Sequence, residues 1–224
     1  MSMNSISVII TAGGIGKRMG GTVPKQFLVI GSKPILIHTL ETIHNYLPHA
    51  EILLTLPLEW EDYWKGLLNE NNCRVEHRII NGGEERYHSV RNAVRESQGD
   101  YIFIHDGVRP FVSVDTIQRC LLGVIRLKAV IPVVPIKESL RKISDDSSAA
   151  VDRSSYRLVQ TPQCFSRDII TKAYELPYHS GITDDASLVE ETGCEVHLVD
   201  GNEENIKITS PTDLLMAEVL MNKK

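Results

Sequence analysis

ISVIITAGGIGKRMGGTVPKQF, residues 6–27, joins an apolar, β-branched run to a glycine-rich loop. The run favours a buried strand. The loop holds five glycines, and a backbone with so few Cβ atoms lets its N–H groups approach a bound anion closely. Lys17, Arg18 and Lys25 add positive charge at the same place. The stretch therefore predicts a phosphate-binding loop at the carboxyl end of the first strand.

Two well-known phosphate-binding motifs do not fit this loop. The third glycine of a dinucleotide-binding fingerprint is replaced by Met19. A P-loop would need glycine where Thr11 stands and serine or threonine where Arg18 stands. On its glycines alone, the stretch could equally be a flexible loop with incidental charges. Pro24 favours the binding interpretation, because it restrains the backbone just before Lys25.

Length and composition indicate one α/β domain, residues 1–224, of ordinary globular character. The net charge of −5 argues against non-specific nucleic-acid binding, which requires an electropositive surface. Basic clusters on an acidic background instead suggest a small anionic substrate. No apolar run is long enough to span a membrane, and the N-terminus lacks the apolar segment of a signal peptide.

The cysteines are widely spaced and form no Cys-x-x-Cys pair, which argues against both a zinc site and a disulfide framework. Histidines likewise lack a convincing metal-ligand spacing. Reduced thiols suit a cytoplasmic protein, and we expect no protein-held metal centre. The cysteine positions are Cys73, Cys120, Cys164 and Cys194.

Apolar strand patterns alternate with amphipathic helix patterns along most of the chain. After the opening run, strands are expected at 28–30, 51–56, 74–80, 101–105, 129–134 and 195–199. Helices are expected from about 34, at 58–69, 89–96 and 115–127, from about 167, from 184, and after the N-cap Ser210. This alternation predicts an α/β fold with a doubly wound, mostly parallel sheet and binding loops at the carboxyl ends of its strands.

Residues 135–161, which we call the arm, break this alternation. They are too polar for a core and too regularly patterned for disorder. Extended segments are expected at 136–143 and 151–159 around a polar tip at 144–149, so we predict a projecting β-hairpin. A symmetric partner chain would give the arm a surface to pack on, which favours a homodimer. Alternatively, the protein is a monomer and the arm is simply exposed to solvent.

Two further polar segments follow predicted strands. In NGGEERYHSV, residues 81–90, paired glycines suit close approach to a flat base, although an ordinary turn with Ser89 or a neighbour as a helix cap fits the spacing nearly as well. In IHDGVRP, residues 104–110, Asp106 and Arg109 lie where the ligand edge of the sheet is expected. An ion pair that closes the turn is the structural alternative for Asp106 and Arg109, and both roles can coexist.

These segments together resemble the polyol-phosphate cytidylyltransferases. The resemblance rests on Ala-Gly-Gly-x-Gly-Lys-Arg-Met, Pro-Lys-Gln-Phe, Gly-Gly-x-x-Arg-x-x-Ser-Val, His-Asp-x-x-Arg-Pro, Val-Asp-Arg-Ser, Gln-Thr-Pro-Gln, Thr-Asp-Asp-Ala-Ser and Asn-Ile-Lys-x-Thr. It implies a Rossmann-like nucleotidyltransferase that uses Mg²⁺ and CTP. Most motifs are similar to the branch that acts on 2-C-methyl-D-erythritol 4-phosphate, in the non-mevalonate route to isoprenoid precursors. The Ala-Gly-Gly loop is closer to the branch that acts on ribitol 5-phosphate, which stays open as an alternative.

The resemblance also implies roles for individual residues. Catalytic cations would be Arg18 and Lys25 at the triphosphate, with Lys207 and Arg153 at the incoming phosphate, Arg153 reaching the site of the partner subunit. The nucleotide would be bound by Ala12, Gly13, Gly14, Gly16, Gly83, Arg86 and Ser89. The polyol would be placed by Asp106, Arg109, Ser139, Thr161 and Thr183. Ser139 stands where the family usually has threonine, and Gly107 and Val108 depart slightly from its pattern.

The expected chemistry needs no general base. A phosphate monoester has a second pKa of about 6, so its oxygen is already ionised near neutrality. Mg²⁺ would be held mainly by the phosphates of CTP, with Asp106 touching the polyol or the metal. A non-catalytic nucleotide-sugar sensor is the alternative from another class, but it would have little reason to keep Lys25, Arg153 and Lys207 together.

Overall fold

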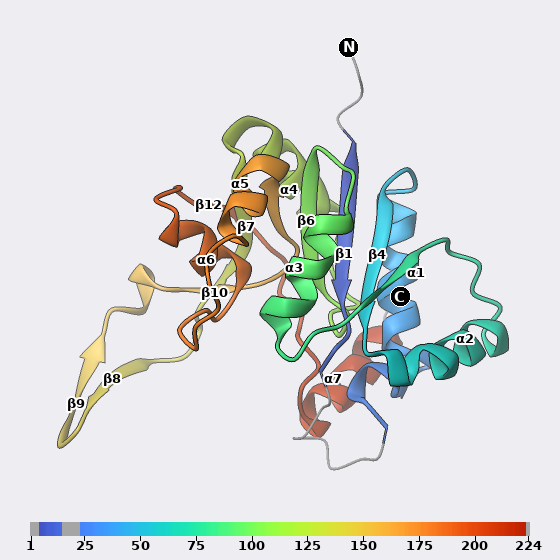
Figure 1. The fold of residues 1–224 in the computed structure, drawn as a ribbon. Helices are drawn as coiled ribbons and strands as arrows, with labels where there is room; N and C mark the ends of the chain where they lie inside the picture. Colours follow the sequence, from blue (N-terminus) through green and yellow to red (C-terminus); the bar gives the residue numbers. More distant parts are fainter. Residues whose placement is uncertain (1–4, 15–22, 223–224) are drawn as a thin grey trace.

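The computed structural model describes residues 5–14 and 23–222, and within these residues eight strands form the main sheet (Figure 1). Its order is β10-β7-β11-β6-β1-β4-β5, and β12 pairs with β7. The strands are β1 Ile6–Thr11, β4 Glu51–Leu56, β5 Arg78–Asn81, β6 Tyr101–Asp106, β7 Ala129–Pro135, β10 Arg157–Val159, β11 Gln163–Ser166 and β12 His197–Asp200.

Most neighbouring strands run parallel, which confirms the predicted sheet. β1 pairs in parallel with both β4 and β6, and β4 with β5. The exceptions are β10 and β11, which run antiparallel to their neighbours β7 and β6. The apolar pattern of the sequence predicts no strand at β11, yet the four residues of β11 are buried in the middle of the sheet.

Helices cover both faces of the sheet, as a doubly wound fold requires. Successive residues of β1 point to opposite faces: Val8 and Ile10 pack in one apolar cluster with α1 and α4, whereas Ile9 packs in the other with α3, α5 and α6. The helices are α1 Ile35–Tyr46, α2 Glu61–Glu70, α3 Arg86–Glu96, α4 Val114–Leu127, α5 Arg167–Ala173, α6 Asp185–Glu191 and α7 Pro211–Met221. No helix in the described ranges is long and apolar enough to cross a membrane.

Several element boundaries differ from those expected. The third helix begins at Arg86, so Ser89 lies inside its first turns and is not its cap. Residues 58–69 divide into a 3-10 turn, Leu58–Trp60, and α2. The strand expected at 74–80 is confined to β5. The cap of the last helix is confirmed, because the Ser210 side chain accepts a hydrogen bond from the Asp213 N–H.

The arm projects from the body of the molecule as a β-hairpin (Figure 1). Its strands β8, Leu140–Ser144, and β9, Ser147–Val151, pair antiparallel around a tighter tip than the one expected at 144–149. The second extended segment, expected at 151–159, is not continuous. It passes through a 3-10 turn at Arg153–Ser155 and returns to the main sheet as β10.

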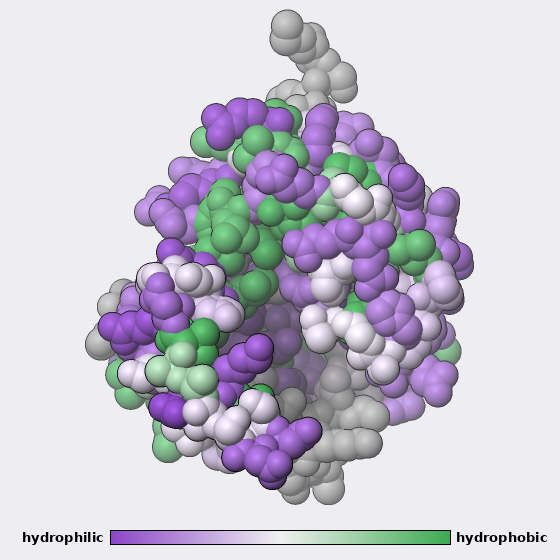
Figure 2. Space-filling model, turned by 90° about the vertical axis from the view of Figure 1, so that its left-hand side faces the viewer, coloured by the Kyte–Doolittle hydropathy of each residue, from purple (hydrophilic) through white to green (hydrophobic). Residues whose placement is uncertain are grey.

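The face viewed in Figure 2 lies on the side from which the arm projects. It is hollowed, and hydrophilic residues gather in the depth of the hollow. The arm itself leaves apolar side chains in solvent: Ile143 is 74% exposed and Leu158 52%. The arm therefore gains little burial from its own chain.

Candidate functional site

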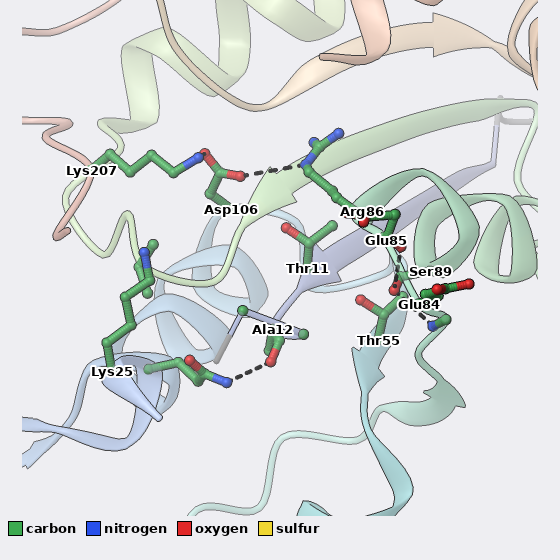
Figure 3. Close-up of a pocket in the computed structure, with 15 residues that line it drawn as sticks. Thr11, Ala12, Lys25, Thr55, Glu84, Glu85, Arg86, Ser89, Asp106 and Lys207 are labelled. Carbon is green, nitrogen blue, oxygen red and sulfur yellow. Dashed lines mark hydrogen bonds and ion pairs between the residues drawn. The ribbon is translucent and has the colours of Figure 1, made fainter. Parts of the chain in front are cut away.

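A cavity of about 440 Å³ opens at the carboxyl ends of β1, β4 and β6 (Figure 3). Its walls come from the exit of β1, the 3-10 helix Lys25–Phe27, the segment that leads into α3, and Lys207. We call this cavity the main pocket. It brings together predicted residues from distant parts of the chain. These are Ala12, Gly13, Gly14, Lys25, Gly83, Arg86, Ser89, Asp106 and Lys207.

Charge is concentrated at Asp106, the last residue of β6. Its Oδ2 lies 3.1 Å from Lys207 Nζ and 3.1 Å from Arg109 Nε, and its Oδ1 lies 3.9 Å from Arg86 Nε. Burial alone would raise the pKa of Asp106, but the cations of Lys207, Arg86 and Arg109 outweigh it and hold that pKa well below its usual value. The Asp106–Arg109 pair confirms the turn-closing ion pair considered from the sequence.

Arg86 is fixed by a partner that sequence reasoning did not identify. Its Nη1 and Nη2 donate to the two carboxylate oxygens of Asp185, at 2.9 and 2.6 Å. Asp185 begins α6, is fully buried, and also accepts a 2.5 Å hydrogen bond from Tyr174 Oη. Burial lowers the pKa of Arg86, but the charge of Asp185 outweighs this and raises it, so the guanidinium stays charged. This bidentate pair joins α6 to the pocket wall.

A buried hydrogen-bond chain holds the turn after β6. Thr161 Oγ1 accepts from the Asp106 N–H at 3.0 Å and donates to His105 Nδ1 at 3.1 Å. The opposite ring nitrogen, Nε2, then donates to the Arg109 carbonyl at 3.0 Å. Burial lowers the pKa of His105 to about 4, which favours this neutral tautomer. Thr161 thus lies behind Asp106 and does not line the main pocket.

The side of the pocket near α3 is lined by Gly83 and Ser89, together with Glu84, Glu85 and Arg86. The Gly83 N–H donates to Ser89 Oγ at 2.9 Å, and Ser89 Oγ donates to the Glu85 carbonyl at 3.2 Å. A Cβ on Gly83 would lie 2.4 Å from the Cβ of His88, so only glycine fits there. A Cβ on Gly13 would lie 3.6 Å from Ser89 Oγ, an ordinary van der Waals distance, so the exit of β1 lies beside α3. Such a slot suits a flat ring.

Gln26, which the sequence analysis did not single out, anchors the lysine side of the pocket. Its Nε2 donates to the Ala12 carbonyl at 2.6 Å, and the side chain is buried. This contact ties the short helix that carries Lys25 to the exit of β1. Figure 3 shows Lys25 and Lys207 on one side of the pocket, with Ser89 and Thr55 on the other.

The remaining predicted residues lie elsewhere. Thr183 lines a smaller neighbouring cavity of about 70 Å³, which shares Arg86 with the main pocket. Ser139 and Arg153 are exposed residues of the arm and line neither cavity. Arg153 donates through Nη1 to the Lys137 carbonyl. Gly16 and Arg18 lie outside the described residues.

Comparisons with known proteins agree along nearly the whole chain. The family model described as 2-C-methyl-D-erythritol 4-phosphate cytidylyltransferase matches residues 6–223. Proteins with that name from Bacteroides fragilis and Bacteroides thetaiotaomicron are 48% and 49% identical over 216 residues. Each alignment covers 96% of this chain and 99% of the relative.

Solved structures agree with the sequence relatives. The 2-C-methyl-D-erythritol 4-phosphate cytidylyltransferase from Thermus thermophilus superposes with a TM-score of 0.80 at 32% identity, covering 97% of this chain and 99% of that one. The 4-diphosphocytidyl-2C-methyl-D-erythritol synthase from Anaerococcus prevotii gives a TM-score of 0.84 at 29% identity, covering 98% and 96%. The names of these four proteins refer to methylerythritol and not to ribitol.

Proposed function

The chain belongs to the 2-C-methyl-D-erythritol 4-phosphate cytidylyltransferase family, and from this premise we propose that it transfers CMP from CTP to 2-C-methyl-D-erythritol 4-phosphate. The products are 4-diphosphocytidyl-2-C-methyl-D-erythritol and pyrophosphate. The observation that carries the proposal is the meeting of Lys25, Lys207 and Asp106 in one pocket at the carboxyl ends of the strands, within a chain that matches this family almost end to end.

In the proposed reaction, the ionised phosphate oxygen of the polyol attacks the α-phosphorus of CTP. A new phosphorus–oxygen bond forms while the bond to the bridging oxygen breaks, and pyrophosphate leaves with that electron pair. The nucleophile is already deprotonated near neutrality, so no side chain has to remove a proton. Lys25 and Arg18 would stabilise the charge on the triphosphate, and Lys207 would hold the incoming phosphate.

The nucleotide and the polyol would occupy different sides of this site. The slot near Gly83 and Ser89 suits the base, which places the triphosphate toward Lys25. Asp106 and Arg109 would orient the polyol, with Thr161 behind them and Thr183 in the adjoining cavity. Arg86 lines both cavities and is held in place by Asp185. It can therefore fix the position of the nucleotide relative to that of the polyol.

Mg²⁺ fits the site as a phosphate-bound ion. Within the described ranges no group of three or more histidine, cysteine, aspartate or glutamate side chains could hold a metal ion by itself. Asp106 Oδ1 is the less engaged oxygen of that carboxylate, so Asp106 can supply one ligand while the phosphates of CTP supply others. When bound, the ion would offset negative charge on the phosphates.

The arm is proposed to complete the site of a second copy of this chain. Arg153 and Ser139 line neither cavity of their own chain, and the arm exposes Ile143, Tyr156 and Leu158. A homodimer in which Arg153 reaches the partner's incoming phosphate accounts for both features. We accordingly treat residues 1–224 as a single nucleotidyltransferase domain with a dimerisation arm. A cytoplasmic location is supported by four free cysteines.

The test of the activity is pyrophosphate release with CTP and Mg²⁺, using methylerythritol phosphate or ribitol 5-phosphate as the acceptor. We expect turnover with methylerythritol phosphate and at most a few per cent of that rate with ribitol phosphate. Faster turnover with ribitol phosphate would reassign the substrate. Binding of CTP without pyrophosphate release with either acceptor would favour a non-catalytic sensor.

The shared site is tested by complementation. A Lys25→Ala chain and an Arg153→Ala chain are each expected to be nearly inactive alone. In a mixed dimer, one of the two sites would combine an intact Lys25 with an intact Arg153 from the partner, so activity should recover to about a quarter of the wild-type value after random mixing. No recovery, with mixed dimers verified by mass spectrometry, would contradict the arm model.

A further inference from the structure

Thr55, at the end of β4, carries a buried hydroxyl that has no hydrogen-bond partner among the described residues. The residue is fully buried, yet it is one of those that line the main pocket. Buried hydroxyl groups nearly always have a partner, because losing water without replacing its hydrogen bond is unfavourable. A valine would fill the same space in the strand without this cost. The hydroxyl therefore requires an explanation beyond strand formation.

Neighbouring hydroxyls on this side of the pocket are already in use. Thr11 Oγ1, one strand away, donates to the His105 carbonyl at 3.4 Å. Ser89 Oγ accepts from the Gly83 N–H and donates to the Glu85 carbonyl. Within the described part of the pocket wall, the hydroxyl of Thr55 is the one left with its donor and acceptor capacity unused.

The position of Thr55 is fixed by its backbone. Its carbonyl accepts a hydrogen bond from the Ala12 N–H at 3.0 Å, where the glycine loop begins. The strand pairs with β1 on one side and β5 on the other. In Figure 3, Thr55 lies beside Ser89 and Glu84 and on the opposite side of the pocket from the two lysines. This is the side of the pocket near α3, away from Lys25 and Lys207.

We propose that the Thr55 hydroxyl donates a hydrogen bond to an acceptor on the edge of the cytosine ring, which makes Thr55 a specificity residue for the nucleotide. The inference rests on the function proposed above. Gly13 and Gly83 bring no side chains of their own into this pocket of about 440 Å³, which leaves their backbones open to a flat ring. Glu84 and Glu85 line the same pocket and supply acceptors for the exocyclic amine, while the threonine supplies the donor for O2 or N3.

The decisive variant is Thr55→Val, which removes the hydroxyl and keeps the shape. We expect the dissociation constant for CTP to rise about five- to tenfold, as for loss of one neutral hydrogen bond. Isothermal titration with CTP and Mg²⁺, without acceptor, measures this constant with no turnover. Inorganic triphosphate, which lacks a base, should bind wild type and variant equally. Thr55→Ser keeps the hydroxyl and should restore CTP affinity.

Thr116→Val is the matched control. Thr116 is also fully buried, but its hydroxyl accepts from Ser113 Oγ at 2.9 Å and donates to Asn202 Oδ1 at 3.2 Å. We expect this variant to melt at a lower temperature than wild type and to bind CTP normally. Thr55→Val should show the opposite pattern, with an unchanged or higher melting temperature in the absence of ligand and weaker CTP binding.

Three results would overturn the inference: an unchanged CTP affinity in Thr55→Val, an equal loss of affinity for CTP and inorganic triphosphate, or a lower melting temperature without ligand. Failure of the proposed function is a separate outcome, seen as wild-type protein that does not bind CTP or binds it without turnover. In steady-state assays, the KM for CTP should rise in Thr55→Val while the KM for the polyol phosphate stays constant.

Discussion

The end of β6 and the arm both carry charged side chains, but they hold them differently. Asp106 is buried, with three cations between 3.1 and 3.9 Å from its carboxylate. At the base of the arm, Lys137 pairs with Glu203, and both side chains are more than half exposed. The pocket is therefore organised by buried contacts within its own chain, whereas the hairpin strands β8 and β9 of the arm are exposed along almost their whole length. Each prediction below changes one side of this contrast.

Among these variants, Asp185→Asn, which removes a buried charge, should lower the free energy of unfolding the most. The variant replaces the fully buried carboxylate that pairs bidentately with Arg86, whose side chain is 33% exposed, and breaking such a pair should cost about 3 kcal/mol, the low end of the range for buried pairs. Urea unfolding measures the loss. The matched variant Glu203→Gln breaks the exposed pair with Lys137 and should cost less than about 1 kcal/mol. Equal losses in the two variants would remove the distinction between the regions.

Lys25→Ala should reduce turnover about a hundredfold, equivalent to about 3 kcal/mol of transition-state stabilisation. The helix that carries Lys25 is anchored by Gln26, so the fold should remain intact by circular dichroism. Lys142→Ala, on the exposed strand β8, is the control and should change turnover less than twofold. A folded Lys25→Ala protein with normal turnover would remove Lys25 from the proposed mechanism.

Acid should lower the free energy of unfolding because His105, behind the buried Asp106, must take up a proton. Its pKa falls from 6.5 to about 4 on folding, so between these values the unfolded chain binds a proton that the folded chain does not. The free energy of unfolding should therefore be highest above pH 6.5 and fall by about 3 kcal/mol toward pH 4. Unfolding titrations of wild type and His105→Gln, compared at pH 7 and 4.5, measure the contribution. Parallel pH profiles would contradict it.

The smallest change in the free energy of unfolding is expected for a substitution at the tip of the arm. Ile143 is 74% exposed, so Ile143→Ser in dilute protein should change the free energy of unfolding by less than about 0.5 kcal/mol. Ile104→Val, in the buried strand β6, removes only one methylene group and should still cost about 1 kcal/mol. A loss above 1 kcal/mol at Ile143 that grows with protein concentration would show that another copy covers the arm.

The sequence predicted what depends on local pattern. Alternating apolar segments located most strands and helices, and Ser210 marked the start of α7 because N-caps act within one turn. Strand β11 was missed because four residues after a Thr-Pro pair are too few to show a period. The arm was expected as one long hairpin, since the pattern of 151–159 could not reveal that Leu158 pairs with Val134 of β7.

Within the candidate site, the sequence located Asp106 from its place at the end of an apolar strand, and it located Lys207 only through the family resemblance of the Asn-Ile-Lys-x-Thr motif. It did not locate Asp185 as the partner of Arg86, because that pair joins segments 99 residues apart. Thr55 was hidden for a different reason. A threonine in an apolar strand is what strand propensity favours, and only the fold shows that this residue lines the pocket and that its hydroxyl has no partner among the described residues.

The contact between Lys207 and Asp106 has a consequence for ligand selectivity. The pocket supplies Lys207 with an internal counter-ion, the Asp106 carboxylate, 3.1 Å away. A singly charged anion such as chloride would have to displace that carboxylate while offering no more charge in return. A dianionic phosphate ester can compete with the carboxylate, and an accompanying divalent cation can compensate Asp106 in turn. In the proposed reaction, this ion pair would therefore disfavour the binding of small monovalent anions at the position of the incoming phosphate.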